Sequence, residues 1–166
     1  MHTWELPPTS NLQEANVHSK VPPRSSPCHN HSTLQWGYYG GGHAGICFRF
    51  EITPETDFTQ VSQVYYRRKR PRVDVEHFYD NRTDLTRLLL VKDKAWKHEC
   101  EVRAISHPSG EYKYPHGMLT GIILGAKIDP AEENAVRSAV ATSGITLEML
   151  RVQPRTRTHG VDIVAA

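Results

Sequence analysis

The chain has 166 residues, 38% of them hydrophobic and 23% charged, with a formal net charge of +2. This length suggests one domain, the small net charge gives no bulk indication of nucleic acid or anionic membranes as partners, and no apolar run approaches the roughly 20 residues of a membrane span. The amino terminus lacks the apolar stretch of a secretory signal and the three cysteines form no disulfide framework, so we expect a reduced, cytoplasmic protein.

Residues 1–33 differ from the rest in composition. They contain five of the eleven prolines and many serines and histidines, without a sustained hydrophobic period. Such a segment buries too little apolar surface to order itself. We therefore predict an irregular arm over residues 1–33, followed by a single α+β domain over residues 34–166.

The next elements read as strands. Residues 45–52 (GICFRFEI) alternate, with Ile46, Phe48 and Phe50 on one side, which predicts a half-buried strand that turns Cys47 and Arg49 to the other side. Residues 61–66 predict a second strand, and an antiparallel pairing with the first is compatible with the short connection.

The middle of the chain predicts a basic segment, a helix and a further strand. Residues 67–72 (RRKRPR) hold five cations in six positions. Residues 83–94 place leucines at helical spacing and predict a helix. Residues 99–106 (ECEVRAIS) return to a period of two, which predicts a strand.

The last part of the chain contains the clearest local signals. Residues 119–128 form a strongly apolar stretch that predicts a central strand. Asp129 is a helix N-cap followed by Pro130 at the first helical position, and Gly144 is a terminating glycine. The buried side of this helix is predicted to carry Ala135, Val136, Ala139 and Val140. Two further strands, 147–152 and 160–164, complete an α+β fold with a mixed, mainly antiparallel sheet and two or three helices.

Residues 36–45 (WGYYGGGHAG) contain five glycines and fit the pattern G-x-G-x-x-G. In a dinucleotide-binding fold these glycines follow a strand and open a helix. Here a predicted strand comes after them, so we interpret the glycines as a turn that leads into that strand. The turn does not account for the nearby aromatic residues and histidine, which makes Trp36, Tyr39 and His43 candidates for ligand contacts.

Three groupings of polar residues are candidates for chemistry. Cys28, His31, His43 and Cys47 have zinc-type spacing, but Cys47 falls inside a predicted strand and Cys28 in the arm, so we predict no metal site and keep zinc binding as a second alternative. The other two groupings are the basic segment and a row of charges on residues 99–106.

The charged row consists of Glu99, Glu101 and Arg103, which share one face of the predicted strand, with Cys100 on the opposite, buried face. Neighbouring carboxylates raise each other's pKa, whereas an adjacent arginine lowers it. Such a row can orient a ribose hydroxyl or stabilise a cationic transition state. A solvated strand face with weak ion pairs explains it equally well.

The basic segment, residues 67–72, has the charge to contact phosphates. Tyr65 and Tyr66 precede it directly and suit either base stacking or a sheet. Acidic residues soon offset the charge, and a solvated hairpin end is the commoner role of such a run. Nucleic-acid binding is therefore kept as an alternative.

Two stretches together resemble the bacterial domain of unknown function family 2971. They are W-x-x-Y-x-x-x-H-x-G-I-C-x-x-F, at residues 36–50, and K-x-x-x-W-x-x-E-x-E-x-R, at residues 92–103. The resemblance covers residues 28–128 and implies a mixed α+β fold. Family members carry a longer amino-terminal portion with an F-N-D-P-like stretch. This chain lacks that stretch and is similar to a truncated or diverged member.

The same motifs are similar, by analogy, to those of ADP-ribosyltransferase-like domains, in which a histidine and aromatic residues hold NAD and a glutamate steadies the ribose. This likeness implies Glu101, Glu99 and His43 as catalytic residues. The ligand-binding candidates are Trp36, Tyr39, Arg49, Trp96 and Arg103. The expected function is a nucleotide- or NAD-handling enzyme; the alternative is a non-catalytic nucleic-acid or protein binding module of a mobile-element or phage-defence system.

Overall fold

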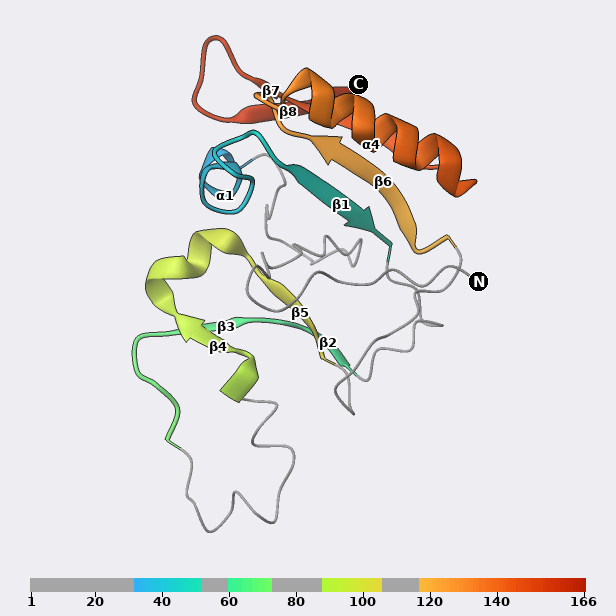
Figure 1. The fold of residues 1–166 in the computed structure, drawn as a ribbon. Coiled ribbons are helices and arrows are strands. Elements are labelled where there is room, and N and C mark those ends of the chain that lie inside the picture. Colours follow the sequence, from blue (N-terminus) through green and yellow to red (C-terminus); the bar gives the residue numbers. More distant parts are fainter. Residues whose placement is uncertain (1–31, 52–59, 73–87, 106–116) are drawn as a thin grey trace. The chain divides into compact units, whose positions relative to one another are not determined.

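The computed structural model describes residues 32–51, 60–72, 88–105 and 117–166, which belong to two compact units (Figure 1). Unit 1 comprises Met1–Thr56 and Tyr112–Ala166, and unit 2 comprises Asp57–Glu111. The predicted arm lies almost entirely outside the described residues. The boundary at residue 33, and a single domain over residues 34–166, stay predictions.

Unit 1 is built on a four-stranded mixed sheet. Its strands are β1 (Ile46–Phe50), β6 (Leu119–Leu124), β7 (Glu148–Pro154) and β8 (Val161–Ala165), and they lie in the order β1-β6-β7-β8. β6 pairs antiparallel with β1 and parallel with β7, and β7 pairs antiparallel with β8. This arrangement confirms the expected α+β class and the central position of the apolar strand.

The helix α4 (Pro130–Ser143) connects the two parallel strands and has the predicted ends. The side chain of Asp129 accepts a hydrogen bond of 2.8 Å from the backbone N–H of Ala131, and Gly144 closes the helix at φ 68°. The predicted buried side is wrong in part. Val136 and Val140 pack towards the sheet, whereas Ala135 and Ala139 are exposed, because the helix turns its two valines to the apolar face.

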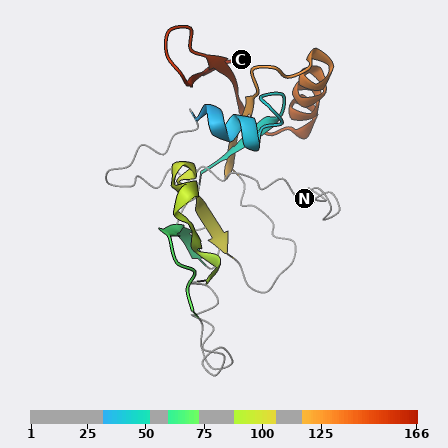
Figure 2. The same cartoon turned by 90° about the vertical axis from the view of Figure 1, so that its left-hand side faces the viewer.

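Both faces of the sheet are covered by apolar side chains. Ile122, Leu124 and Ile128 pack with the valines of α4, while Ile123 and Val152 pack on the other face with Trp36. Trp36 belongs to α1 (Thr33–Tyr38), and Figure 2 shows α1 and α4 on opposite sides of β6. Successive side chains of β6 therefore pack alternately into two apolar clusters, one on each face of the sheet.

This two-sided burial corrects the prediction for β1. Cys47, expected on the polar side, packs against the cluster around Trp36, and burial raises the pKa of its thiol. Phe48, expected in the core, is 40% exposed. The sequence pattern assumed one buried face, but an edge strand of this sheet meets apolar neighbours on either side.

The described residues of unit 2 include two small pairs of strands and a short 3₁₀ helix. β2 (Gln60–Gln63) pairs antiparallel with β5 (Val102–Ile105), β3 (Tyr65–Arg67) pairs parallel with β4 (Val91–Asp93), and η2 (Lys94–Glu99) follows β4 directly. The predicted strand over residues 61–66 is therefore two strands. They divide at the buried Val64, whose N–H donates to the carbonyl of Glu101 at 2.9 Å.

The suggested pairing of this strand with the first strand is wrong, because the partner of β2 is β5. The predicted helix over residues 83–94 is also corrected at its end. Leu88 and Leu89 are helical, but Val91–Asp93 form β4, and the preceding part of the prediction lies outside the described residues. Pairing with β3 overrides the helical spacing at this point.

Residues 99–106 differ from the predicted strand at their start. Glu99 is the last residue of η2, and Cys100 adopts a left-handed conformation at φ 50°, so the strand begins only at Val102. Cys100 is half-buried and is a free thiol, as is Cys47. The three charges therefore do not form a row on one strand face.

Within the residues that the structure describes, no helix has the length and apolar character to cross a membrane. The cytoplasmic location stays a prediction.

Candidate functional site

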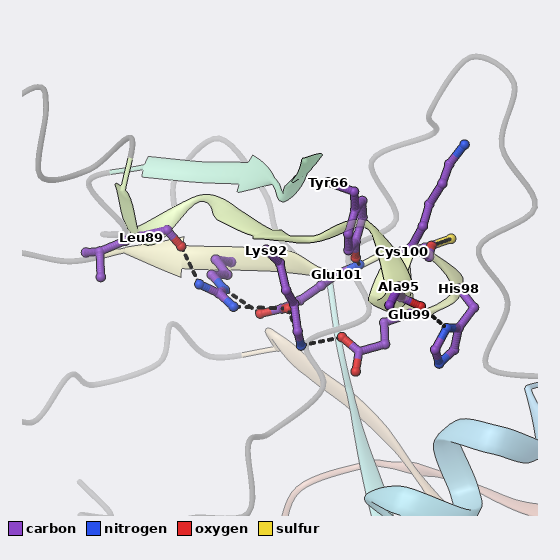
Figure 3. Close-up of polar contacts among 10 residues, drawn as sticks. Tyr66, Leu89, Lys92, Ala95, His98, Glu99, Cys100 and Glu101 are labelled. Atoms are coloured by element: carbon purple, nitrogen blue, oxygen red, sulfur yellow. Dashed lines mark hydrogen bonds and ion pairs between the residues drawn. The ribbon is translucent and has the colours of Figure 1, made fainter. Parts of the chain in front are cut away.

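Two carboxylates and two cations form a compact cluster in unit 2 (Figure 3). Nζ of Lys92 donates to Oε2 of Glu99 at 2.5 Å and to Oε2 of Glu101 at 3.1 Å. The guanidinium of Arg103 donates to both carboxylate oxygens of Glu101. The side chains of Glu99 and Glu101 are only 5% and 14% exposed, so their charges depend on these partners.

Local structure brings these side chains together. Lys92 projects from β4, Glu99 ends η2, and Arg103 comes from β5, whereas Glu101 lies between η2 and β5. The left-handed turn at Cys100 separates the two glutamates. The sequence singled out both glutamates and Arg103 correctly as neighbours, although a turn rather than a strand face makes them so.

Hydrogen bonds within the cluster shift the pKa values of Glu101 and Lys92. Burial alone would raise the pKa of Glu101, but hydrogen bonds from Arg103 and Lys92 outweigh it and lower the pKa below its ordinary value. Burial would likewise lower the pKa of Lys92, yet its bonds to Glu99 and Glu101 raise it to about 12. Glu101 is therefore ionised at neutral pH and paired with two cations, an arrangement that stabilises the fold and does not favour a proton-transfer role.

Two further contacts tie the cluster to the surrounding backbone. The N–H of Glu101 donates to the hydroxyl of Tyr66 at 2.8 Å, and Arg103 donates to the carbonyl of Leu89. Figure 3 shows Tyr66 and Leu89 on either side of the carboxylates. β3, β4 and β5 are thereby joined through side chains as well as through strand pairing.

Trp96 lies beside this cluster on the surface of η2. Nζ of Lys92 is 5.2 Å from the centroid of the Trp96 ring, and the ring of His98 stacks against Trp96 with centroids 6.1 Å apart. The tryptophan is 39% exposed. Lys92 therefore meets two carboxylates and an aromatic face, and the aromatic contact adds to its stabilisation as a cation.

The basic segment lines a cavity of about 210 Å³ in unit 2. The lining residues are Arg67, Arg68, Lys69, Arg70, Pro71, Val91, Lys92 and Asp93. The four cations that follow one another in the chain are all exposed, and none of them makes an ion pair with a residue that the structure describes. They leave a concentrated positive charge around one small hollow.

The charge of this cavity is not balanced from within. Lys92 is already paired with two glutamates, and Asp93 uses its carboxylate to cap η2 by accepting a hydrogen bond of 2.8 Å from the N–H of Ala95. Among the lining residues that the structure describes, the four successive cations Arg67–Arg70 are thus accompanied by one carboxylate, that of Asp93. The volume is below the range of about 300–1,000 Å³ that is usual for whole small-molecule ligands, and it suits a phosphate group better than an entire dinucleotide.

His43 occupies a strained position in unit 1. Its φ is 75°, a left-handed conformation that is uncommon for a residue other than glycine, and it follows Gly41 and Gly42 at 58° and 64°. The glycines are needed because this turn requires successive positive φ angles. The predicted turn before β1 is therefore confirmed, and its physical reason is backbone conformation rather than phosphate binding.

The backbone holds His43 at both ends. Its N–H donates to the carbonyl of Trp36 at 3.2 Å, and its carbonyl accepts from the N–H of Lys127 at 2.9 Å. Nδ1 is buried and has no hydrogen-bond partner among the described residues. Strain and an unpartnered ring nitrogen are features that accumulate at functional positions.

The other sequence-predicted residues of unit 1 are already engaged. Trp36 is 5% exposed within the core, and Tyr39 is the C-cap residue of α1. Arg49 pairs with Glu148 and donates to the hydroxyl of Thr120 at 3.2 Å. Trp36 and Arg49 therefore have structural roles through their side chains, and Tyr39 has one through its backbone.

The candidate residues fall into separate units. Glu99, Glu101, Arg103 and Trp96 come together in unit 2, whereas Trp36, Tyr39, His43 and Arg49 belong to unit 1. Of the zinc alternative, Cys28 and His31 lie outside the described residues. Among those that are described, no group of three or more histidines, cysteines and acidic residues could hold a metal ion, and zinc binding stays a prediction.

Sequence reasoning left Lys92 out of the candidate site residues, and it named Tyr65 only as a residue that suits either base stacking or a sheet. Of the described cations that line the cavity, Lys92 alone also contacts Glu99 and Glu101. The available signal for Lys92 was its place at the start of the K-x-x-x-W-x-x-E-x-E-x-R stretch, residues 92–103. The available signal for Tyr65 was its position directly before the basic segment.

Comparison with protein-family models, with curated proteins and with solved structures found no match for this chain.

Proposed function

We propose that this protein is a nucleic-acid-binding module and that the cavity of unit 2 holds backbone phosphates. The observation that carries the proposal is the set of four exposed cations, Arg67–Arg70, around a hollow of about 210 Å³ whose described lining residues include a single carboxylate, that of Asp93. When such side chains contact backbone phosphates, they displace the counterions that surround the nucleic acid. The release of these counterions drives binding without regard to sequence. A chain with a net charge of only +2 then owes its affinity to a local concentration of charge.

Salt dependence tests this proposal. The affinity of the full chain for a labelled oligonucleotide is measured by fluorescence anisotropy at several salt concentrations. The triple variant R67Q/R68Q/R70Q should bind much more weakly, with the slope of log affinity against log salt reduced by about 2–3, since each lost phosphate contact removes about 0.7–0.9.

A matched pair of single variants provides the control. Arg68→Gln and Arg157→Gln remove the same charge from exposed arginines, one in the cavity and one in the turn between β7 and β8 of unit 1. Only Arg68→Gln should lower the salt slope, by about 1. Equal effects of the two variants, or no binding by the unaltered protein, would refute the proposal.

His43 favours a second candidate function, that of an NAD-handling transferase related to family 2971. Its left-handed backbone and its Nδ1, which has no hydrogen-bond partner among the described residues, support a ligand contact. Arg49, which belongs to the same unit as His43, would hold a phosphate of the ligand.

Incubation of the protein with NAD tests this candidate function. The enzyme candidate requires that nicotinamide is released and that NAD raises the melting temperature. Both effects should be abolished by His43→Ala. Glu101→Gln should abolish release if Glu101 is catalytic. If neither release nor a thermal shift occurs with the unaltered protein, the enzyme candidate is excluded and the binding module stands alone.

A further inference from the structure

The exposed side of β3 carries an aromatic ring next to the basic cavity. Along β3, Tyr65 and Arg67 are exposed and Tyr66 is half-buried. Because side chains two residues apart share a face of a strand, Tyr65 and Arg67 point to the same side, and Tyr66 points to the carboxylate cluster. Tyr65 is 57% exposed, which is unusual for a large aromatic residue on a paired strand.

The register of the parallel pair relates Tyr65 to the cavity. Tyr65 pairs with Val91, and Arg67 pairs with Asp93. Val91, Asp93 and Arg67 all line the cavity. Tyr65 thus borders the cavity in two ways, as the cross-strand neighbour of Val91 and as the residue two positions before Arg67, a separation of about 7 Å along the strand.

The opposite face of the same strand pair is already used. Tyr66 accepts a hydrogen bond from the N–H of Glu101, and Lys92 pairs with both glutamates. This network makes the strand pair a supported platform rather than a loose ribbon. It also leaves the face with Tyr65 and Arg67 as the one that meets solvent.

We infer that Tyr65 is a base-stacking residue and that the preferred ligand is single-stranded nucleic acid, an inference that rests on the proposed function. A phosphate in the cavity places the attached nucleotide at the border where Tyr65 lies. Bases in a duplex are stacked on one another and present no free face, whereas a single strand offers its bases to an exposed aromatic ring. Stacking accepts any base, so the recognition tolerates sequence.

Three labelled probes of about 12 nucleotides test the inference: a thymidine single strand, an abasic strand with the same phosphates, and a duplex of equal length. Anisotropy titrations of the full chain should rank the thymidine strand first. Tyr65→Ala should weaken its binding by about 5- to 100-fold, the range expected for loss of one stacked base, and should leave the abasic strand and the duplex unaffected.

Two variants serve as controls. Tyr65→Phe keeps the ring and removes only the hydroxyl, so it should bind the thymidine strand like the unaltered protein. Tyr38→Ala removes a comparably exposed ring, 61% exposed, from unit 1 and should have no effect. Thermal melting of each variant identifies any loss of folding.

The outcomes separate this inference from the proposed function. If Tyr65→Ala changes nothing or weakens all three probes equally, or if the unaltered protein prefers the duplex, base stacking by Tyr65 is refuted. Phosphate binding then still stands, provided that the R67Q/R68Q/R70Q variant loses the abasic strand. If the unaltered protein binds none of the probes, the proposed function fails as well.

Discussion

Unit 1 and unit 2 stabilise themselves with different kinds of buried side chain. In unit 1, Ile123, Leu124, Val152 and Val161 are at most 1% exposed and belong to apolar clusters on the two faces of the sheet. In unit 2, buried Val64 and Leu90 are accompanied by a buried carboxylate, Glu99, in an ion-pair network. Apolar burial is favourable in itself, whereas buried ion pairs only offset the cost of desolvation.

The difference shows how one chain can combine a stable scaffold with a charged surface. Each ion pair among the described residues of unit 1 has a partner that is at least 32% exposed, as in Arg155 with Asp162. Unit 2 places its paired charges inside and exposes Arg67–Arg70, which make no ion pair with any residue that the structure describes. Unit 2 is therefore the region whose stability and interactions should respond most to pH and salt.

The largest expected effect is in the apolar core of unit 1. Leu124→Ala should destabilise this unit by about 2–5 kcal/mol, because the leucine is 0% exposed and its removal leaves a cavity. Hydrogen exchange measured in increasing urea would give this change in the free energy of unfolding for each amide. Leu34→Ala, at a leucine that is 53% exposed in the same unit, should change the free energy of unfolding by less than about 0.5 kcal/mol.

Glu101→Gln should act on unit 2 with the next largest effect. It keeps the shape of the side chain but removes the charge that faces Lys92 and Arg103, at an expected cost of about 1–3 kcal/mol. Exchange protection should fall in β3, β4 and β5. Glu148→Gln, at the 56% exposed partner of Arg49, should cost under about 1 kcal/mol. Equal costs for the two would remove the contrast between the units.

The same variant should alter the pH dependence of stability. The pKa of Glu101 is lowered in the folded state, so its contribution is fully present above its unfolded value of about 4.5 and disappears as the pH falls through the folded value. The unfolding free energies of the unaltered protein and of Glu101→Gln, measured from pH 7 downwards, should therefore converge at low pH. A difference that stays constant would show that the charge of Glu101 is not what stabilises unit 2.

A smaller effect is expected at the start of α4. Asp129→Ala removes the acceptor for the N–H of Ala131 and should cost about 1 kcal/mol, whereas Asp129→Asn should recover most of this loss. Thermal melting of the two variants measures the difference. Because α4 is packed through only one narrow face, a much larger loss would mean that the cap, rather than apolar contact, holds the helix in place.

Signals confined to neighbouring residues gave correct predictions. The ends of α4 follow from Asp129, Pro130 and Gly144, each of which acts on backbone groups within one turn. The central strand β6 follows from its continuous apolar run. By contrast, α1 was missed, because six residues with a glycine among them are too few to show a helical period.

Predictions that depended on distant partners were corrected. β2 pairs with β5, and β3 pairs in parallel with β4. In both cases the partners are distant in the sequence, and no local sequence pattern indicates which residues pair with one another. The left-handed turn at Cys100 also has no local cause in the sequence. The charged row was thus recognised by its residues but assigned to the wrong backbone geometry.

The sequence by itself determined the α+β class, the helix with its two ends, the central strand, and the concentration of charge at residues 67–72. Only the tertiary structure decided that Lys92 lies between Glu99 and Glu101, and that Tyr65 and Arg67 share an exposed face. The reason is the range of the forces involved. Caps, turns and apolar runs act over a few residues, whereas ion pairs and strand register are set by segments that meet only when the chain has folded.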